Sequence, residues 1–437
     1  MKSSINYKHL LILLPPFVCA PLLAQQTYPL SVDELFSKGE ANSLRIKESQ
    51  IHQSIAAERE KTALTNRLPD ISVGATGGYV GETTIFQQGL SRPTHPETPN
   101  WSQNYNVQLT QPLYNGGRIR NNIRQASLQK QIAALNLTTD KAELKLLLLR
   151  QYLNLIGYYK QKELFARNVE ESEVRLKDIR RMRKEGIVTR NDEIRSELQL
   201  TNDKLNLEEA GNSIAIISQQ LDLILGLEES LLLQPDTLVL ATVTHVADYE
   251  EYIRQASVHY PELQIARTNI EMAQNNVLLS KADNLPSLSL KAGNTLARPL
   301  SSSMTDMFAN NWNIMLNLSY HLSSLYKNKH KVREARQTVS LYQNMEEQVS
   351  QDVRIHVNSA YIRHREALRR VEALSLSVKQ AEENYRIVRN RYLNQLSILT
   401  DLLDASNVRL EADLQLTKAR TETLYTYYEL QRSCGNL

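Results

Sequence analysis

Short stretches of the chain alternate between apolar and polar residues. From Trp312 to Tyr320, every second residue is apolar or aromatic, and most of the residues between them are polar. Tyr105, Val107 and Leu109 alternate with asparagine and glutamine in the same way, and residues 71–79 precede them with the same spacing. A period of two is typical of β-strands with one apolar and one polar face. The pattern predicts two pairs of strands of about ten residues each, the length that a tilted strand needs to cross a bilayer.

The segments outside the strands show the spacing of helices. Residues 118–185 contain only Gly157 and no proline, which predicts one helix of about 100 Å at 1.5 Å per residue. A coiled-coil pattern runs through Val371, Leu374, Val378, Ala381, Tyr385, Val388 and Tyr392 and returns at Leu399, Leu403, Ser406 and Leu410. A weaker pattern runs through Val169, Ser172, Leu176 and Ile179 and is answered by Ile194, Leu198, Thr201 and Leu205. We therefore predict two antiparallel helical hairpins.

The two halves of the chain repeat each other. The segment Leu68-Pro69-Asp70-Ile71-Ser72 returns 217 residues later as Leu285-Pro286-Ser287-Leu288-Ser289, and Asp192 matches Asp401 at an offset of 209. A longer loop at residues 82–100 explains the change of offset. In each half, a leading helix (residues 31–66 and 248–284) and a returning helix (190–226 and 399–433) are predicted to stack end to end beside the long helix, with an interruption at Pro261. Neither half can bury its apolar face alone, so the halves should pack together.

These patterns divide the chain into eight segments. They are a signal peptide at 1–24, a periplasmic helix at 25–69, a membrane strand pair at 70–112, long helices with a hairpin at 113–226, a linker at 227–247, a second periplasmic helix at 248–285, a second strand pair at 286–320, and the second set of long helices at 321–437. The leader is assigned because Lys2 and Lys8 precede an apolar run that ends at Ala24. The alternative, a membrane anchor, is disfavoured by the three prolines within that run. Its removal leaves Cys434 as the only thiol, so no disulfide framework is expected.

Composition excludes several classes of protein. The 51 Lys and Arg residues nearly balance the 48 Asp and Glu residues, so the chain offers no general electrostatic attraction to nucleic acid. With 41% hydrophobic residues and no second long apolar run, the mature chain is not a bundle of transmembrane helices. If the chain lies in a membrane, it does so through its strands.

Four strands cannot close a barrel, because the smallest membrane barrels have about eight strands and open edges do not persist in hydrocarbon. Either the sheet is an ordinary half-buried sheet of a soluble domain, or several chains share one barrel, and a trimer would supply twelve strands. The strand ends carry residues suited to an aromatic girdle at the lipid headgroups. These residues are Tyr79, Trp101, Tyr105, Trp312 and Tyr320.

Over about four hundred residues, the order of these features resembles the TolC-type outer-membrane efflux proteins. The duplicated halves, the two strands per half, the long helices and the segment from Tyr392 to Ala405 carry the resemblance. It implies an α+β membrane protein: a homotrimer with one twelve-stranded β-barrel in outer-membrane lipid, continuous with a periplasmic α-helical barrel. It also implies a periplasmic adaptor protein and an inner-membrane RND or ABC transporter as partners. The implied function is efflux of drugs, metals or other toxic compounds, with the exit duct of a type I protein secretion system as the alternative.

The same resemblance implies a gate at the periplasmic end. The family's two pore aspartates correspond to Asp401 and Asp404, and three copies would place six carboxylates around one constriction that favours cations. The alternative is a solvated helix face. A tyrosine and an aspartate that hold the closed state in the family correspond to Tyr392 and Asp192, which predicts a hydroxyl-to-carboxylate link. The family's arginine in this network falls on Ser397, so the closed state is expected to use other pairs, with Arg190 or Arg391 as candidates.

The hairpin tips are the expected docking surfaces for the adaptor. Gly186 matches the family's tip glycine, and Ile187 and Val188 follow it. In the second tip, either Asn394 or Gln395 must adopt the left-handed turn conformation, which asparagine tolerates better, and Leu396 is the apolar residue beside them. Plain turn chemistry is the alternative for each of these residues.

Enzymatic functions find no support in the sequence. Gly74, Gly77, Gly78 and Gly81 lie within an alternating strand and lack the Lys-Ser/Thr of a phosphate-binding loop. His356 and His364 lack the glutamate pattern of a zinc protease. We therefore expect no catalytic residues, no metal and no cofactor. An exported coiled-coil scaffold without a pore is a distant alternative, but it leaves the amphipathic strands unexplained.

Overall fold

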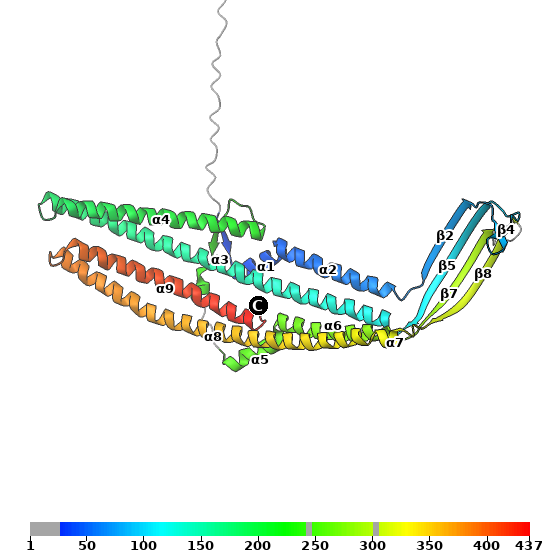
Figure 1. Cartoon of the computed structure of the whole chain (residues 1–437). Helices are drawn as coiled ribbons and strands as arrows, with labels where there is room; N and C mark the ends of the chain where they lie inside the picture. Colours follow the sequence, from blue (N-terminus) through cyan, green and yellow to red (C-terminus); the bar gives the residue numbers. More distant parts are fainter. Residues whose placement is uncertain (1–26, 242–246, 300–305) are drawn as a thin grey trace, which may run out of the picture.

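The computed structural model describes residues 27–241, 247–299 and 306–437. The segment predicted as a signal peptide lies outside the described residues, as does part of the linker. Figure 1 shows an elongated molecule with a β-sheet at one end and helical hairpins at the other. Among the described residues, no helix is long and apolar enough to cross a membrane.

The sheet consists of the four predicted strands. They are β2 (Asp70–Tyr79), β5 (Trp101–Asn115), β7 (Ser287–Arg298) and β8 (Ala309–Ser319), all antiparallel in the order β2-β5-β7-β8. One strand pair comes from each half of the chain, and β5 pairs with β7 across the repeat. The short strands β3 (Ile85–Gln88) and β4 (Ser91–Thr94) form a hairpin within the loop between β2 and β5. The edges of β2 and β8 are unpaired in the described chain.

The register places the apolar residues of all four strands on one face. Ile71 is opposite Leu109, which is opposite Ala292, which in turn is opposite Ile314. This apolar face is exposed in a single chain, with 61% exposure for Ile71 and 66% for Ile314. The other face carries Ser, Thr, Asn and Gln, because side chains of a strand alternate between the two sides. The alternation of apolar and polar residues in the sequence therefore corresponds to an apolar and a polar face of the sheet.

Long helices form the rest of the molecule. They are α1 (Val32–Asn42), α2 (Leu44–Thr65), α3 (Arg118–Lys184), α4 (Arg190–Leu225), α5 (Tyr249–His259), α6 (Pro261–Ala282), α7 (Ser324–Lys327), α8 (Lys329–Leu393) and α9 (Leu399–Ser433). As predicted, α2 and α4 lie along different parts of α3, and α6 and α9 lie along α8 (Figure 1). The leading helix is broken in both halves. Pro261 disfavours helical geometry at Tyr260, as the sequence predicted, whereas the matching break at Ser43 has no proline to signal it.

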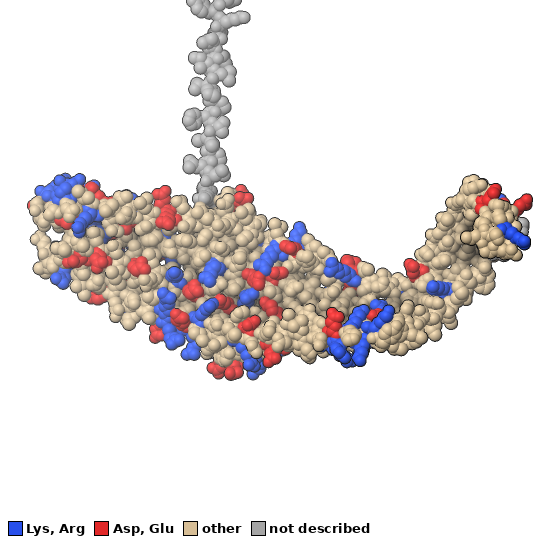
Figure 2. All heavy atoms as spheres, viewed as in Figure 1, with Lys and Arg blue, Asp and Glu red and all other residues tan. Residues whose placement is uncertain are grey.

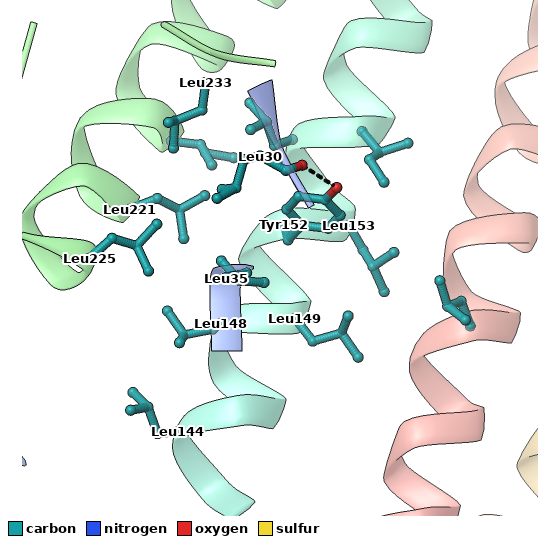
Figure 3. Close-up of a cluster of buried hydrophobic side chains, with 14 of the residues drawn as sticks. Leu30, Leu35, Leu144, Leu148, Leu149, Tyr152, Leu153, Leu221, Leu225 and Leu233 are labelled. Atoms are coloured by element: carbon teal, nitrogen blue, oxygen red, sulfur yellow. Dashed lines mark hydrogen bonds between the residues drawn. The ribbon is translucent and has the colours of Figure 1, made fainter. Parts of the chain in front are cut away.

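The middle of the molecule contains the main hydrophobic core. There β1 (Thr27–Leu30) pairs in parallel with β6 (Leu232–Pro235), which leads into the 3₁₀ helix η1 (Thr237–Ala241). Figure 3 shows side chains of α3 and α4 packed around these strands, with Tyr152 at the centre. The Tyr152 hydroxyl donates to the Leu30 carbonyl at 2.7 Å and accepts from the Asp236 amide at 2.8 Å. Burial raises the pKa of Tyr152 to about 12, so the hydroxyl stays protonated as this pairing requires.

Asp222 lies on α4 beside this core. It is fully buried, and neither carboxylate oxygen has a hydrogen-bond partner within the described residues. Burial raises the pKa of Asp222 to about 6, and the nearby charge of Glu229 adds to the shift. Ionising an unpartnered carboxylate in an apolar setting is unfavourable, so this side chain opposes folding when it is charged.

Replacing Asp222 with Asn should therefore stabilise the protein at neutral pH. Because the folded state holds this proton more tightly than the unfolded state, wild-type stability falls as pH rises from about 4 to about 6, and the penalty is complete above that window. We expect Asp222→Asn to raise Tm by roughly 2–4 °C at pH 7.5 and by much less at pH 4. Thermal unfolding in detergent between pH 4 and 8 measures this, and a Tm difference independent of pH would contradict it.

Candidate functional site

The first hairpin turns at Gly186. α3 ends at Lys184, and Gly186 has a φ of +74°, a left-handed conformation that glycine adopts at little cost. The Ile187 amide then donates to the Met182 carbonyl at 2.9 Å. Ile187 is exposed at the tip, and Val188 is half-buried. The tip thus presents one apolar side chain to its surroundings.

The second hairpin turns at Gln395 rather than at Asn394. Asn394 has a φ of −93°, and its side-chain amide donates to the Asn390 carbonyl at 2.8 Å, which caps the last turn of α8. Gln395 takes the left-handed conformation instead, with a φ of +59°. The Leu396 amide donates to the Arg391 carbonyl at 2.8 Å, and the Leu396 side chain is exposed. Of the two residues that the sequence offered for this turn, it is therefore Gln395 that adopts the left-handed conformation, although asparagine tolerates it better.

The matching aspartates Asp192 and Asp401 both cap the helix that follows their tip. The Asp192 carboxylate accepts from the Thr189 amide at 2.9 Å and from the Thr189 hydroxyl at 2.7 Å. The Asp401 carboxylate accepts from the Ser397 hydroxyl at 2.6 Å and from the Ile398 amide at 3.4 Å. The first turn of a helix has amides without helical partners, so an acceptor at this position is stabilising.

Asp401 and Asp404 lie on one face of α9. They are three residues apart, which places them one helical turn from each other, and both are exposed. The structure therefore brings together the two carboxylates that the sequence assigned to a gate. Among the residues that the structure describes, no three His, Cys, Asp or Glu side chains gather as a metal site would require.

The predicted link between Tyr392 and Asp192 is not formed. The Tyr392 hydroxyl is buried without a hydrogen-bond partner in the described chain, and the Asp192 carboxylate accepts from Thr189 instead. Burial raises the pKa of Tyr392, and the nearby Asp192 charge adds to this rise. The other candidate partners, Arg190 and Arg391, stay within their own hairpins: Arg190 pairs with Glu193 at 2.8 Å, and Arg391 donates to the Leu396 carbonyl at 3.3 Å.

A different contact joins the two hairpins. The Glu171 carboxylate on α3 accepts from Arg409 on α9 at 2.6 Å and from the Tyr385 hydroxyl on α8 at 3.2 Å. We call this three-residue contact the Glu171 clasp. The Arg409 guanidinium also stacks over the Tyr385 ring, 4.1 Å from its centroid. Sequence analysis missed the clasp, because the coiled-coil pattern singled out Tyr385 only as a packing residue.

Cavities flank the Glu171 clasp on both sides. One of about 280 Å³ is bordered by Arg167, Asn168 and Asp413, and the other, of about 290 Å³, by Asp178 and Tyr392. Tyr385, Arg389 and Arg409 border both cavities. The hairpins therefore touch through a polar contact and are not closely packed around it.

The seam of the first hairpin follows the prediction on α3, where Val169 is half-buried and Ser172, Leu176 and Ile179 are buried, but it differs from the prediction on α4. In the part of α4 from Arg190 to Ala210, the buried residues are Glu193, Ser196, Asp203 and Ala210, whereas Ile194, Leu198, Thr201 and Leu205 are exposed. The two buried carboxylates of this seam are paired: Glu193 with Arg183 and Arg190, whose contacts lower the pKa of that carboxyl, and Asp203 with the Ser172 hydroxyl at 2.5 Å. The seam of the second hairpin follows the predicted residues, which are buried or half-buried.

The aromatic residues predicted for a girdle are exposed. Tyr79 and Trp101 are opposite each other at one end of the sheet, with ring centroids 6.1 Å apart. Tyr105 and Trp312 lie on the same apolar face, and Tyr320 follows β8 at the end nearer the helices. An exposed apolar sheet face with aromatic ends, joined to a helical body, defines a membrane protein that contributes strands to a bilayer.

Comparisons with known proteins identify the family. The family model described as "Outer membrane efflux protein" matches residues 35–227 and 252–436. The chain therefore belongs to the outer membrane efflux protein family, and it is an outer-membrane protein with its helices in the periplasm. A search of curated proteins found no match.

Solved structures of outer-membrane channels share the fold. The outer-membrane channel OprN is 17% identical with a TM-score of 0.77, over 93% of this chain and 90% of that one. CusC is 15% identical with a TM-score of 0.78, over 92% of each chain. The MtrE outer membrane channel of Neisseria gonorrhoeae is 18% identical with a TM-score of 0.74, over 92% of this chain and 88% of that one. The predicted duplicated fold of strands and long helices is confirmed.

Proposed function

We propose that three copies of this chain form one outer-membrane exit duct of a tripartite efflux system. The single observation that carries the proposal is the sheet, which has one exposed apolar face, one polar face and two unpaired edges. An open edge in hydrocarbon leaves amides and carbonyls without partners, so the edge of β8 must pair with β2 of the next copy. Three copies then give a closed barrel of twelve strands whose polar faces line the lumen.

The helical part also has surfaces that neighbouring copies would cover. One stripe on α4 consists of Ile194, Leu198, Leu205, Ile216 and Leu223, which are 48–61% exposed. A second stripe on α8 includes Ile355, Ile362, Leu376 and Ile387, which are 46–60% exposed. Exposure of these apolar stripes to water costs free energy, and packing between copies removes that cost. Such packing would continue the strand barrel as a helical tunnel.

The family description names efflux, and we propose small molecules as the cargo of this duct, with protein secretion as the alternative. The tips, at Gly186 to Val188 and Asn394 to Leu396, point away from the sheet and form the end that would meet the periplasmic adaptor (Figure 1). An inner-membrane RND or ABC transporter would supply the cargo. Asp401 and Asp404 lie close to the tip end, so three copies would ring the narrow entrance with carboxylates.

Membrane extraction and dye accumulation test this function. We expect the protein to stay with outer membranes through a high-salt wash and to leave them only with detergent. Cells that lack the chain should retain more of a fluorescent pump substrate, and the wild-type gene should restore export. Release by salt, with no change in retained dye, would favour the scaffold alternative.

The Glu171 clasp is expected to hold the closed state of the duct. Replacing Glu171 with Gln removes the ion pair with Arg409 and weakens the contact between hairpins. A loss of about 1–2 kcal/mol from the closed state would raise the open fraction roughly 5- to 30-fold. Single-channel recordings in planar bilayers measure this.

Glu173 provides the matched control for the clasp. It lies on the same helix, but its partner is Lys204 within the same hairpin, at 2.7 Å. Glu173→Gln should leave the open fraction unchanged. Equal effects of the two substitutions would show that the clasp has no special role in closing the duct.

A further inference from the structure

The polar face of the sheet carries very little charge. Along the described parts of β2, β5, β7 and β8, this face consists of Ser, Thr, Asn, Gln and Gly with a few apolar residues. Asp70 and Lys291 are the two ionisable residues on it. Figure 2 likewise shows few charged side chains on the visible side of the sheet between its two ends, whereas the helical part carries many.

Asp70 and Lys291 lie in the same row across the sheet. Asp70 is opposite Thr110, Thr110 is opposite Lys291, and Lys291 is opposite Met315. Neighbouring strands are about 4.8 Å apart, so two strand spacings place the two backbones about 10 Å from each other. Both side chains are exposed, and neither forms an ion pair within the described residues. All other rows of this face lack charge.

Closure of the barrel would repeat this row around the lumen. This step rests on the proposed trimer, in which β8 of one copy pairs with β2 of the next. Asp70 is on the first strand of each set of four and Lys291 on the third, so charged residues recur on every second strand with alternating sign. We propose that Asp70 and Lys291 form a charge-balanced ring that makes the barrel nearly indifferent to the sign of its cargo.

The dimensions support cancellation of the two signs. Twelve strands about 4.8 Å apart and tilted by about 40° give a radius of roughly 12 Å, and the tilt offsets the Asp70 and Lys291 rings by roughly 6 Å along the axis. The Debye length is about 10 Å at 0.1 M salt. Because the Asp70 and Lys291 rings are offset by less than the Debye length, their opposite electrostatic potentials cancel near the barrel axis. If either Asp70 or Lys291 is neutralised, three like charges remain in the trimer, and their potential would act on ions across the lumen.

Reversal potentials under a KCl gradient test the ring. The recordings use purified protein in planar bilayers. Every channel also carries Asp401→Asn and Asp404→Asn as its background, so that the carboxylates proposed at the periplasmic entrance do not contribute to ion selectivity. Lys291→Gln should raise the permeability ratio of K⁺ to Cl⁻ roughly two- to threefold at 0.1 M salt, and Asp70→Asn should lower it by a similar factor. The double variant should return to the background ratio, and both shifts should shrink at 1 M salt.

Conservative and distant substitutions serve as controls. Lys291→Arg and Asp70→Glu keep the charges and should leave the ratio unchanged, as should Lys327→Gln on α7, outside the sheet. The proposed ring would be overturned if the channels conduct but Lys291→Gln and Asp70→Asn leave the permeability ratio of K⁺ to Cl⁻ unchanged. It would also be overturned if both variants shift this ratio in the same direction. Preparations that never conduct, including wild type, would overturn the proposed duct itself.

Discussion

Replacing Ile314 with Arg should abolish the assembled protein. Ile314 lies in the middle of β8 on the apolar face and is 66% exposed in a single chain, so in the barrel it would face lipid. Arginine near the bilayer midplane costs about 2–4 kcal/mol per copy in a membrane barrel, and three copies multiply that cost. We expect the heat-resistant oligomer in outer membranes to disappear on semi-native gels, together with dye export.

The neighbouring residue provides the control for this prediction. Asn313 is on the opposite, polar face of the same strand, beside Gly293 of β7. Asn313→Arg should assemble at close to wild-type levels, because its side chain would extend into the aqueous lumen. If Ile314→Arg assembled normally while Asn313→Arg failed, the two faces of the sheet would be assigned the wrong way round.

Neutralising Asp401 and Asp404 should have the second-largest effect. Asparagine also caps helices well, so Asp401→Asn preserves the start of α9 while removing the charge. Three copies of the double variant lose six negative charges at one constriction. Each close unit charge contributes about 1 kcal/mol to binding a monovalent cation even in water, so the concentration of a trivalent cation that half-blocks the channel should rise at least about tenfold.

Glu411→Gln is the control for the gate. Glu411 is exposed on the same helix, two turns beyond Asp404 and further from the tip. Planar-bilayer conductance with a trivalent cation titrated from the periplasmic side measures the block. We expect Glu411→Gln to change it little. If the Asp401/Asp404 variant matched wild type in conductance and in block, the solvated-face alternative would hold for these residues.

The sequence predicted the repeated architecture well because burial controls it directly. The alternation from Trp312 to Leu318 fits only a strand in a sheet with two different faces. Residues 118–185 contain no proline and a single glycine, so nothing in this range ends α3. Pro261 marks a helix break because its ring restricts the residue before it. Each of these features depends on residues that are close together in the chain, so a single sequence is enough to predict it.

Features that depend on contacts between distant residues were missed. The α4 seam is polar because Arg183 and Ser172 of α3 satisfy it, and no periodicity on α4 reveals partners on another helix. Ile194, Leu198, Thr201 and Leu205 were therefore assigned to the wrong side of α4. The Glu171 clasp joins residues more than two hundred positions apart.

The number of chains in the conducting particle tests the central claim most directly. Detergent-purified protein would be examined by native mass spectrometry and then reconstituted into a planar lipid bilayer. We expect a particle with three times the mass of one mature chain, and discrete conductance steps after insertion. A monomer that conducts no ions would contradict the shared barrel and every inference built on it.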